Sequence, residues 1–299
     1  MKRYYIGIDG GGTKTEFLLT DEKENIIKRV IKSGSNPNDI GLDNSYMVLS
    51  NGISELLSDI EAEPSKIYIF AGVSGAGVGD NAETLRAKLA ERYPNVRVGS
   101  DLWNGLELCL GGEDGIAVIC GTGISCCVYT DGEIRIVGGY GHLFENGGSG
   151  YAYGRDLIKY ALQAEDGIIP RSPIVKRLCE KFAVPSVRAA LGNLLTGGKT
   201  SISQLCPLVF EGDNDGDKIC QRVVRENLSH TETLIKQAIE VTKGYALPIS
   251  FIGGVTKEKA FRSYMDSAFS EKKLLFTDEK PVMGAVRLAK KGVKSCRRK

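Results

Sequence analysis

Histidine is almost absent from this 299-residue chain, which contains only His142 and His230. Two scattered histidines exclude a metal site of the HExxH type, which needs a closely spaced pair on one helix. The eight cysteines include no CxxC pair and lack the spacing of a cysteine-ligated cluster. Because we find no secretory signal in the sequence, we expect these cysteines to be reduced core residues.

Long apolar runs and an excess of one charge are also missing. No stretch approaches the roughly 18 apolar residues of a membrane-spanning helix. The 39 Lys plus Arg nearly balance the 37 Asp plus Glu, for a net charge of +2. This balance gives no reason to expect nucleic acid or an anionic membrane as a partner. The basic run at 290–299 predicts a solvated terminus, and we expect a soluble cytoplasmic protein.

The length and the 42% hydrophobic content supply cores for two domains. In the first half, apolar runs with strand patterning alternate with helical patterns. The predicted strands cover 4–9, 14–19, 26–32, 66–73 and 96–100, the predicted helices cover 45–59 and 81–92, and a loop covers 33–39. Strands separated by helices predict crossover connections on a largely parallel sheet.

The same order of elements begins again in the second half. Residues 115–139 read as strand, glycine turn, strand, turn and strand. They are followed by a helical region at 151–242, a strand at 248–255, a helix at 257–269, a strand at 273–277 and a helix at 281–291. The second half is therefore predicted to be a diverged structural copy of the first, with extra helices inserted. Two similar α/β halves would enclose a cleft, the usual place for a small-molecule site.

Each half contains a glycine turn that could cradle a phosphate, because no side chain blocks the approach to its backbone amides. The turn residues are Gly10, Gly11, Gly12, Thr13 and Lys14 in the first half and Gly121, Thr122 and Gly123 in the second. Asp9 directly precedes the first turn and could hold Mg²⁺. Either turn alone could serve an ordinary hairpin, but two turns at equivalent places favour phosphate binding.

Three other ligand motifs fit less well. A P-loop places its lysine at the start of a helix, whereas Lys14 opens a predicted strand. The stretch 75–82 resembles a Rossmann fingerprint, but it lies several residues past the preceding strand and leaves both glycine turns unexplained. A calcium loop near Gly216 would need Glu at its twelfth position, where Arg222 stands.

Phosphoryl transfer needs a carboxylate near the attacking hydroxyl. Asp101 follows the predicted strand at 96–100, at the edge where open α/β sheets usually build their sites. Asp101 is therefore the candidate base. It would equally suit the N-cap of the segment that follows, a duty that Ser100 could share, and the residues alone leave both interpretations open.

Three more segments have side chains or backbone that suit the binding of a sugar or of a nucleotide. Asn36 offers an amide that both donates and accepts, which suits a vicinal diol, although an Asn before proline also suits a turn. The loop at 138–154 combines aromatic and polar groups, as sugar sites do, although tyrosines in such a segment are more often core residues. Gly253 and Gly254 end a strand and would let a flat ring such as adenine approach the backbone.

Taken in order, the motifs resemble those of a known family. They are IGIDGGGTKT, SNPND, AGVSGAG, SDLWN, CGTGIS, GGYGHLFENGGSGYAYG and FIGGV, spread over essentially the whole chain. This set resembles the BadF/BadG/BcrA/BcrD ATPase family, and within it the N-acetylglucosamine kinases of the actin, sugar kinase and Hsp70 superfamily. The resemblance implies an α/β fold with two RNase H-like (actin-like ATPase) domains facing a central cleft, with ATP and Mg²⁺ in the cleft.

The same resemblance implies domain limits and an activity. It places the N-terminal domain at 1–113, completed by the C-terminal helix at 281–299, and the C-terminal domain at 114–280. It implies transfer of phosphate from ATP to the 6-hydroxyl of N-acetylglucosamine or a related hexosamine, and it suggests a homodimer.

Site residues also follow from the resemblance, position by position. Asp101 would be the base that accepts the proton of the 6-hydroxyl, and Asp9 would hold the metal. The nucleotide would be bound by Gly10, Gly11, Gly12, Thr13, Lys14, Gly121, Thr122, Gly123, Gly253 and Gly254. The sugar would be bound by Asn36, Ser74, Gly75, Thr122, Gly139, Tyr140 and Asn146.

One loop departs from the family pattern. Where these kinases usually have Gly-Asp-Glu-Gly-Ser, this chain has Glu145 followed by Asn146, Gly147, Gly148 and Ser149. Glu145 is a candidate for a displaced sugar-binding carboxylate. Two alternative functions stay open: an ATPase that activates a partner enzyme through a cysteine-bound iron–sulfur cluster, and a sugar or nucleotide sensor without turnover.

Overall fold

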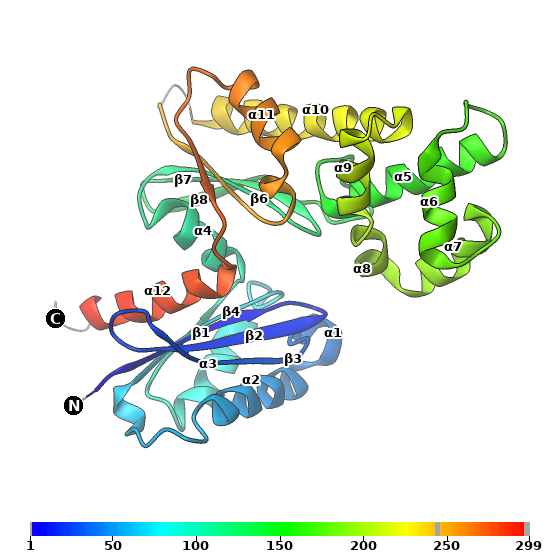
Figure 1. Cartoon of the computed structure of the whole chain (residues 1–299). Helices are drawn as coiled ribbons and strands as arrows, with labels where there is room; N and C mark the ends of the chain where they lie inside the picture. The colour runs from blue at the N-terminus through cyan, green and yellow to red at the C-terminus, as the bar shows by residue number, and fades with distance from the viewer. Residues whose placement is uncertain (1, 243–245, 296–299) are drawn as a thin grey trace. The chain divides into compact units, whose positions relative to one another are not determined.

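The computed structural model describes residues 2–242 and 246–295. The chain divides into two compact units, each drawn in Figure 1. The N-terminal unit consists of Met1–Gly112 together with Glu279–Lys299, and the C-terminal unit consists of Glu113–Asp278. No helix in the described ranges is long and apolar enough to cross a membrane.

A five-stranded mixed sheet forms the centre of the N-terminal unit. Its strands are β1 (Tyr4–Gly10), β2 (Lys14–Thr20), β3 (Ile26–Ser33), β4 (Ile67–Val73) and β5 (Asn95–Gly99), in the order β3-β2-β1-β4-β5. The first three strands pair antiparallel, whereas β4 and β5 continue parallel to β1. The prediction of a largely parallel sheet is therefore wrong for half of the pairings, because two tight turns join β1, β2 and β3 as hairpins.

The helices of this unit cover both faces of the sheet (Figure 1). They are α1 (Pro37–Ile40), α2 (Leu42–Leu56), the 3₁₀ helix η1 (Pro64–Lys66), α3 (Asn81–Ala90), α4 (Leu102–Leu110) and α12 (Pro281–Ser295). The helix predicted at 45–59 begins and ends three residues earlier, and the predicted loop at 33–39 overlaps the short helix α1, which extends to Ile40. Asn36 explains that helix, because its side chain accepts a hydrogen bond from the Asn38 amide as an N-cap.

The sheet of the C-terminal unit repeats the strand order of the first. Its strands are β6 (Gly115–Cys120), β7 (Ile124–Thr130), β8 (Glu133–Gly138), β9 (Ile249–Ile252) and β10 (Leu274–Thr277), in the order β10-β9-β6-β7-β8. Again the first three pair antiparallel, and β9 and β10 run parallel to β6. The predicted α/β duplication is confirmed at the level of sheet topology.

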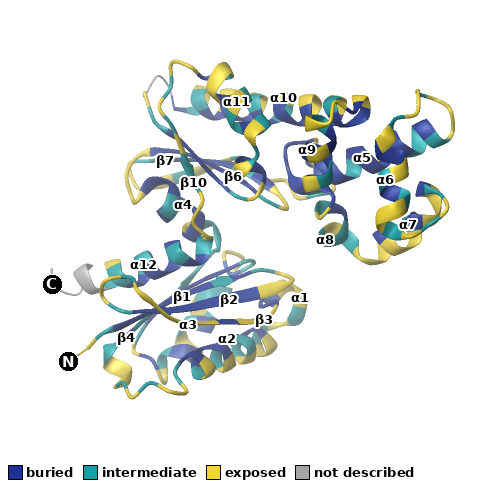
Figure 2. Ribbon diagram, viewed as in Figure 1, coloured by how far each residue is buried: buried dark blue, intermediate teal, exposed yellow. Residues whose placement is uncertain are grey.

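The helices of the C-terminal unit fall mostly between β8 and β9. They are α5 (Gly150–Glu165), α6 (Pro173–Phe182), α7 (Val187–Thr196), α8 (Gly198–Ser203), α9 (Cys206–Asn214) and α10 (Lys218–Val241), followed after β9 by η2 (Val255–Lys257) and α11 (Lys259–Ala268). One continuous core joins the sheet to these helices (Figure 2). Six of the described cysteines are buried and Cys179 is half-buried, in line with the prediction of core residues.

Helix α12 packs on the sheet face opposite α2 and α3. Its apolar side chains contact residues that alternate with those facing α2 and α3 along β1 and β4. The contact is close enough that a Cβ atom at Gly7 would lie 2.5 Å from both the Val282 carbonyl oxygen and the Val286 nitrogen. Glycine is therefore required where the helix backbone crosses β1. Lys291 adds hydrogen bonds of 2.7 Å to Glu107 and 2.6 Å to the Gly111 carbonyl.

We expect Val286→Ala to destabilise the N-terminal unit by about 2 kcal/mol, because Val286 is fully buried between α12 and the sheet. Trp103 is the one tryptophan of the sequence and lies on α4 of this unit. Urea unfolding followed by tryptophan fluorescence would therefore report on this unit. The control Met47→Ala, on a side chain that is 52% exposed, should change the free energy of unfolding by less than about 0.5 kcal/mol. Equal effects of the two substitutions would contradict the packing argument.

Candidate functional site

The first glycine turn is supported from beneath by the end of β3. The Gly11 amide donates to the Lys14 carbonyl at 2.9 Å and closes the turn. The Ser35 amide donates to the Gly11 carbonyl at 3.0 Å, and the Thr15 hydroxyl donates to Ser35 Oγ at 2.9 Å. Gly12 and the two residues after it remain exposed. The turn is thus fixed on one side and open to a ligand on the other.

Asp9 and Asp101 lie at the carboxyl ends of parallel strands of one sheet, β1 and β5. Burial raises the pKa of Asp9 to about 6; the neighbouring charges of Asp101 and Glu16 add to this rise, while a hydrogen bond from Asn104 opposes it. Burial also raises the pKa of Asp101. Two partly desolvated carboxylates at one sheet edge are the kind of group that binds a cation or moves a proton.

Asn104 is a site residue that the sequence analysis did not identify. Its Nδ2 donates to Asp9 Oδ1 at 2.8 Å and to the Ile8 carbonyl at 3.3 Å. The side chain is fully buried, so it fixes the orientation of the Asp9 carboxylate. The available signal was its position one helical turn after Asp101, inside the SDLWN motif.

The alternative role of Asp101 as a helix cap is not what the structure shows. Asp101 precedes α4 with helical dihedrals, and its side chain makes no capping hydrogen bond. Instead, Ser100 Oγ accepts from the Leu102 amide at 3.3 Å and donates to Asp101 Oδ1 at 3.2 Å. Ser100 therefore supplies the side-chain cap of α4. Hydrogen bonds to the Asp101 carboxylate from the Ser100 hydroxyl and from backbone amides partly offset the rise in its pKa that burial causes.

Asn36, Ser74 and Gly75 come together beside the first glycine turn. The backbone of Gly75, with φ +80°, lies directly against Asn36 Oδ1, and the Ser74 amide donates to the Gly10 carbonyl at 2.7 Å. Asn81 Nδ2 donates to the Gly75 carbonyl at 3.0 Å and holds this loop in place. Asn36 caps α1 as the turn interpretation expected, and its Nδ2 also donates to Asp39 at 2.9 Å.

The second glycine turn is held by the start of α5. The Gly121 amide donates to the Gly123 carbonyl at 2.9 Å, which closes the turn. The first amides of α5 then donate to the turn, from Gly150 to the Gly121 carbonyl at 2.7 Å and from Tyr151 to the Thr122 carbonyl at 3.2 Å. The first amides of a helix have no partner within the helix, so the start of α5 can hold this turn although the two are far apart in sequence.

A cavity of about 340 Å³ joins the second glycine turn to the end of β9. Its lining residues are Gly121, Thr122, Gly150, Ser203, Cys206, Pro207, Gly254, Val255 and Glu258. Three of the predicted nucleotide-binding residues therefore share one hollow although they are widely separated in sequence. Gly253, with φ +123°, presses against the Cys120 carbonyl, where any side chain would overlap it. The lining contributed by α8 and α9 had no motif to reveal it.

The loop between β8 and α5 is organised around Glu145, which is only 5% exposed. Glu145 Oε2 accepts from the Gly139 amide at 2.9 Å and from the Tyr140 amide at 3.3 Å, and Oε1 lies 3.0 Å from His230 Nε2. Both carboxylate oxygens are thus engaged inside the unit. These contacts favour a structural role for Glu145, and its role as a displaced sugar-binding carboxylate stays a prediction.

The predicted sugar-binding residues of this loop are exposed. Tyr140 is 67% exposed, so it is not one of the core tyrosines, unlike Tyr153, which is fully buried. Gly139 and Asn146 are also exposed, and the Asn146 carbonyl accepts from Arg155 at 2.7 Å. Arg155 also donates to the Glu145 carbonyl at 3.2 Å, so the loop is held at its base and open at its tip.

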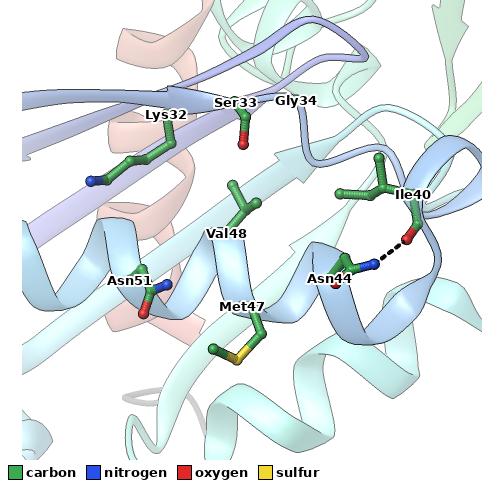
Figure 3. Close-up of a pocket in the computed structure, with 8 residues that line it drawn as sticks. All are labelled: Lys32, Ser33, Gly34, Ile40, Asn44, Met47, Val48 and Asn51. Carbon is green, nitrogen blue, oxygen red and sulfur yellow. Dashed lines mark hydrogen bonds between the residues drawn. The ribbon is translucent and has the colours of Figure 1, made fainter.

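A further cavity, of about 450 Å³, lies between β3 and α2 in the N-terminal unit (Figure 3). Its lining combines aliphatic side chains with amides, including Met47 and Asn44, whose Nδ2 donates to the Ile40 carbonyl at 2.8 Å. None of the predicted site residues lines it. The predicted residues instead form two groups: one around Asp9, Asn36 and Asp101 in the N-terminal unit, and one around the second glycine turn in the C-terminal unit.

Nearly the whole chain is similar to proteins of one known family. The model of the BadF/BadG/BcrA/BcrD ATPase family matches residues 6–289. An N-acetyl-D-glucosamine kinase of Dictyostelium discoideum is 27% identical over 312 residues, which cover 96% of this chain and 98% of that protein. An N-acetylmuramic acid/N-acetylglucosamine kinase of Clostridium acetobutylicum is 25% identical, with 96% and 98% covered.

Solved structures show the same fold. A provisionally named N-acetylglucosamine kinase of Chromobacterium violaceum has a TM-score of 0.77 at 23% identity, with 96% of this chain and 99% of that chain covered. A ROK family glucokinase from Streptomyces griseus, in complex with glucose and AMPPNP, has a TM-score of 0.59 at 18% identity, with 97% and 99% covered. The fold is therefore that of two-domain sugar kinases.

We expect the stability of the N-terminal unit to fall with rising pH because of Asp9. Its folded pKa of about 6 lies above the ordinary 3.8. The stability that Asp9 contributes is therefore fully present at low pH and is lost as the pH rises through about 6, by about 2–3 kcal/mol. Urea unfolding followed by Trp103 fluorescence, with EDTA present, should show this loss in the wild type between pH 4 and pH 7.5.

Asp9→Asn should remove that part of the pH dependence. Asp59→Asn, at an exposed carboxylate of the same unit whose pKa is lowered mainly by its hydrogen bond from Lys28, should keep the wild-type dependence. An identical pH profile in the wild type and in Asp9→Asn would show that burial does not perturb Asp9.

We expect Glu145→Ala to loosen the loop between β8 and α5, because it removes the acceptor of the Gly139 and Tyr140 amides. Hydrogen exchange of a peptide covering 138–148 should accelerate by roughly tenfold or more. Glu145→Gln keeps an acceptor oxygen and should restore part of the protection. Glu133→Ala, on exposed β8, is the matched control and should leave that peptide unchanged. Unchanged exchange in Glu145→Ala would mean that other contacts hold the loop.

Proposed function

This chain belongs to the BadF/BadG/BcrA/BcrD ATPase family, and we propose that it is an ATP-dependent sugar kinase. The acceptor that we propose is the 6-hydroxyl of N-acetylglucosamine or a closely related hexosamine. The relatives from Dictyostelium discoideum and Clostridium acetobutylicum, both named as N-acetylglucosamine kinases, support the substrate class. Each matches this chain over nearly its full length.

The observation that carries the proposal is the position of Asp101 and its lack of a side-chain capping hydrogen bond. A nucleotide cavity alone would suit an ATPase, a sensor or a kinase, but only a kinase needs a base for an acceptor hydroxyl. Asp101 lies at the sheet edge near Asp9, its side chain makes no capping hydrogen bond to α4, and burial raises its pKa. A carboxylate with a raised pKa is a stronger base for the proton of a hydroxyl.

In the proposed reaction, Asp101 accepts the proton of the sugar 6-hydroxyl as its oxygen attacks the γ-phosphorus of ATP. The bond between the γ-phosphorus and the β,γ-bridging oxygen breaks, and ADP leaves. Asn36, Ser74 and Gly75 would orient the sugar in the N-terminal unit, and Gly139, Tyr140, Asn146 and Thr122 would do so in the C-terminal unit. The amides of both glycine turns would stabilise the charge on the phosphates.

Asp9 fits the role of a magnesium ligand. Mg²⁺ is usually held by one or two carboxylates together with substrate phosphates and water. Asp9 is one such carboxylate, and no cluster of three or more His, Cys, Asp or Glu side chains in the described ranges could hold a metal alone. When bound, Mg²⁺ would neutralise charge on the β- and γ-phosphates. Asn104 would keep the Asp9 carboxylate oriented toward it.

The nucleotide assignments follow the two glycine turns. Gly10, Gly11, Gly12, Thr13 and Lys14 would contact the phosphates from the N-terminal unit, and Gly121, Thr122 and Gly123 from the C-terminal unit. Gly253 and Gly254 would lie against the adenosine, and Gly254 lines the same cavity as Thr122. The sensor alternative depends on the unusual loop at 145–149, and the measurement of sugar-stimulated ADP release distinguishes it from the kinase.

We expect Asp101→Asn to lower kcat by about 10²- to 10⁴-fold with little change in ATP affinity, because it removes the base but keeps the shape. A coupled ADP-release assay over N-acetylglucosamine, glucosamine, N-acetylmannosamine and N-acetylmuramic acid would measure this and rank the substrates. A 6-deoxy analogue of the preferred sugar should inhibit without turnover.

The matched control is Asp59→Asn, an exposed carboxylate of the same unit, which should keep wild-type turnover. ADP release that no sugar stimulates would argue against a sugar kinase. Wild-type turnover by Asp101→Asn would leave the kinase proposal standing but remove Asp101 as its base.

A further inference from the structure

Glu258 is the one charged side chain that lines the cavity beside the second glycine turn. It lies just after η2 and precedes α11, and it is half-buried. Its position at the start of α11 would suit a helix cap, but its side chain makes no capping hydrogen bond. Within the described ranges no side chain or backbone amide donates to its carboxylate.

The surroundings of Glu258 make this isolation unfavourable. Burial raises the pKa of Glu258, and the charge of Glu211 raises it further. Glu211 itself pairs with Arg177 at 3.1 Å, so that arginine does not neutralise Glu258. A partly desolvated carboxylate without donors costs free energy that a ligand with hydroxyl or amine donors would recover. The cavity is therefore lined by a hydrogen-bond acceptor to which the described part of the protein donates no hydrogen bond.

We propose that the Glu258 carboxylate binds the vicinal 2′- and 3′-hydroxyls of the nucleotide ribose. The inference rests on the proposed function only in taking the cavity beside Gly121 and Thr122 as the nucleotide site. A diol presents two donors to the two oxygens of a carboxylate, which is acceptor-only when ionised. Acidic side chains bind ribose hydroxyls in the same way in dinucleotide-binding folds.

Two other parts of a nucleotide fit Glu258 less well. The phosphates would be repelled by a carboxylate, and the glycine turn already offers them amides. At the base edge, a carboxylate would pair best with guanine, whose N1 and N2 are both donors, whereas the family is one of ATPases. The ribose is the part of ATP whose chemistry matches an unpaired acceptor.

Isothermal titration calorimetry with ATP, 2′-deoxyATP and GTP would test the assignment on the full chain without using catalysis. We expect the wild type to bind ATP roughly tenfold or more tightly than 2′-deoxyATP, which corresponds to one hydrogen bond to a charged group. Glu258→Ala should bind the two with equal affinity within about twofold, and Glu258→Gln should be intermediate. Glu211→Gln, at the neighbouring carboxylate outside the cavity lining, should keep the wild-type preference.

The outcomes separate this inference from the proposed function. A wild-type preference for ATP over 2′-deoxyATP that survives in Glu258→Ala would overturn the inference and leave the kinase proposal intact. A preference for GTP that Glu258→Ala abolishes would overturn it too, because Glu258 would then bind the base. Wild-type protein that binds no nucleotide would overturn both. Should Glu258→Ala fail to fold by circular dichroism, the isosteric Glu258→Gln decides by the same comparison.

Discussion

The hydrogen bond from Asn104 to Asp9 is the contact on which the N-terminal site depends. It joins the end of β1 to the first turn of α4, across the backbone of Gly72 on β4 and beside Gly284 on α12. Four elements therefore have to meet before the carboxylate is held. Without that donor, Asp9 would be a buried charge close to the carboxylates of Asp101 and Glu16, with only the charge of Lys14 to oppose them. The geometry of the site therefore depends on the correct packing of the whole unit.

In the C-terminal unit, two carboxylates differ in whether the protein itself donates hydrogen bonds to them. Glu145 and Glu258 both lie at loops that follow a strand. Glu145 is engaged by two amides and His230, so its charge is used to shape the loop. Glu258 lies on the wall of a cavity and receives no hydrogen bond from the described residues. A carboxylate that receives its hydrogen bonds from the protein has a structural role. A carboxylate beside a cavity that receives none from the protein is a candidate for binding a ligand.

The sequence reveals those features that depend on neighbours along the chain. The glycine turns, the strand ends at Asp9 and Asp101, and the repeated order of elements all follow from short-range patterns. The pairing of Asn104 with Asp9 does not, because it depends on how α4 packs against β1. The same holds for the cavity wall on α8 and α9, which lies in a helical region without any motif. The burial of Glu145 could not be predicted either, because it depends on the contact with His230 on α10.

The position of α12 has a consequence for how the protein is made. The ribosome synthesises the sheet of the N-terminal unit first, and the helix that covers one face of it only after the entire C-terminal unit has been translated. Until then Tyr5, Leu18 and Phe70 present an uncovered apolar face in the nascent chain. Such a surface is a binding site for chaperones and a starting point for aggregation. A chain that terminates before α12 would keep that apolar face exposed permanently and would therefore be prone to aggregate.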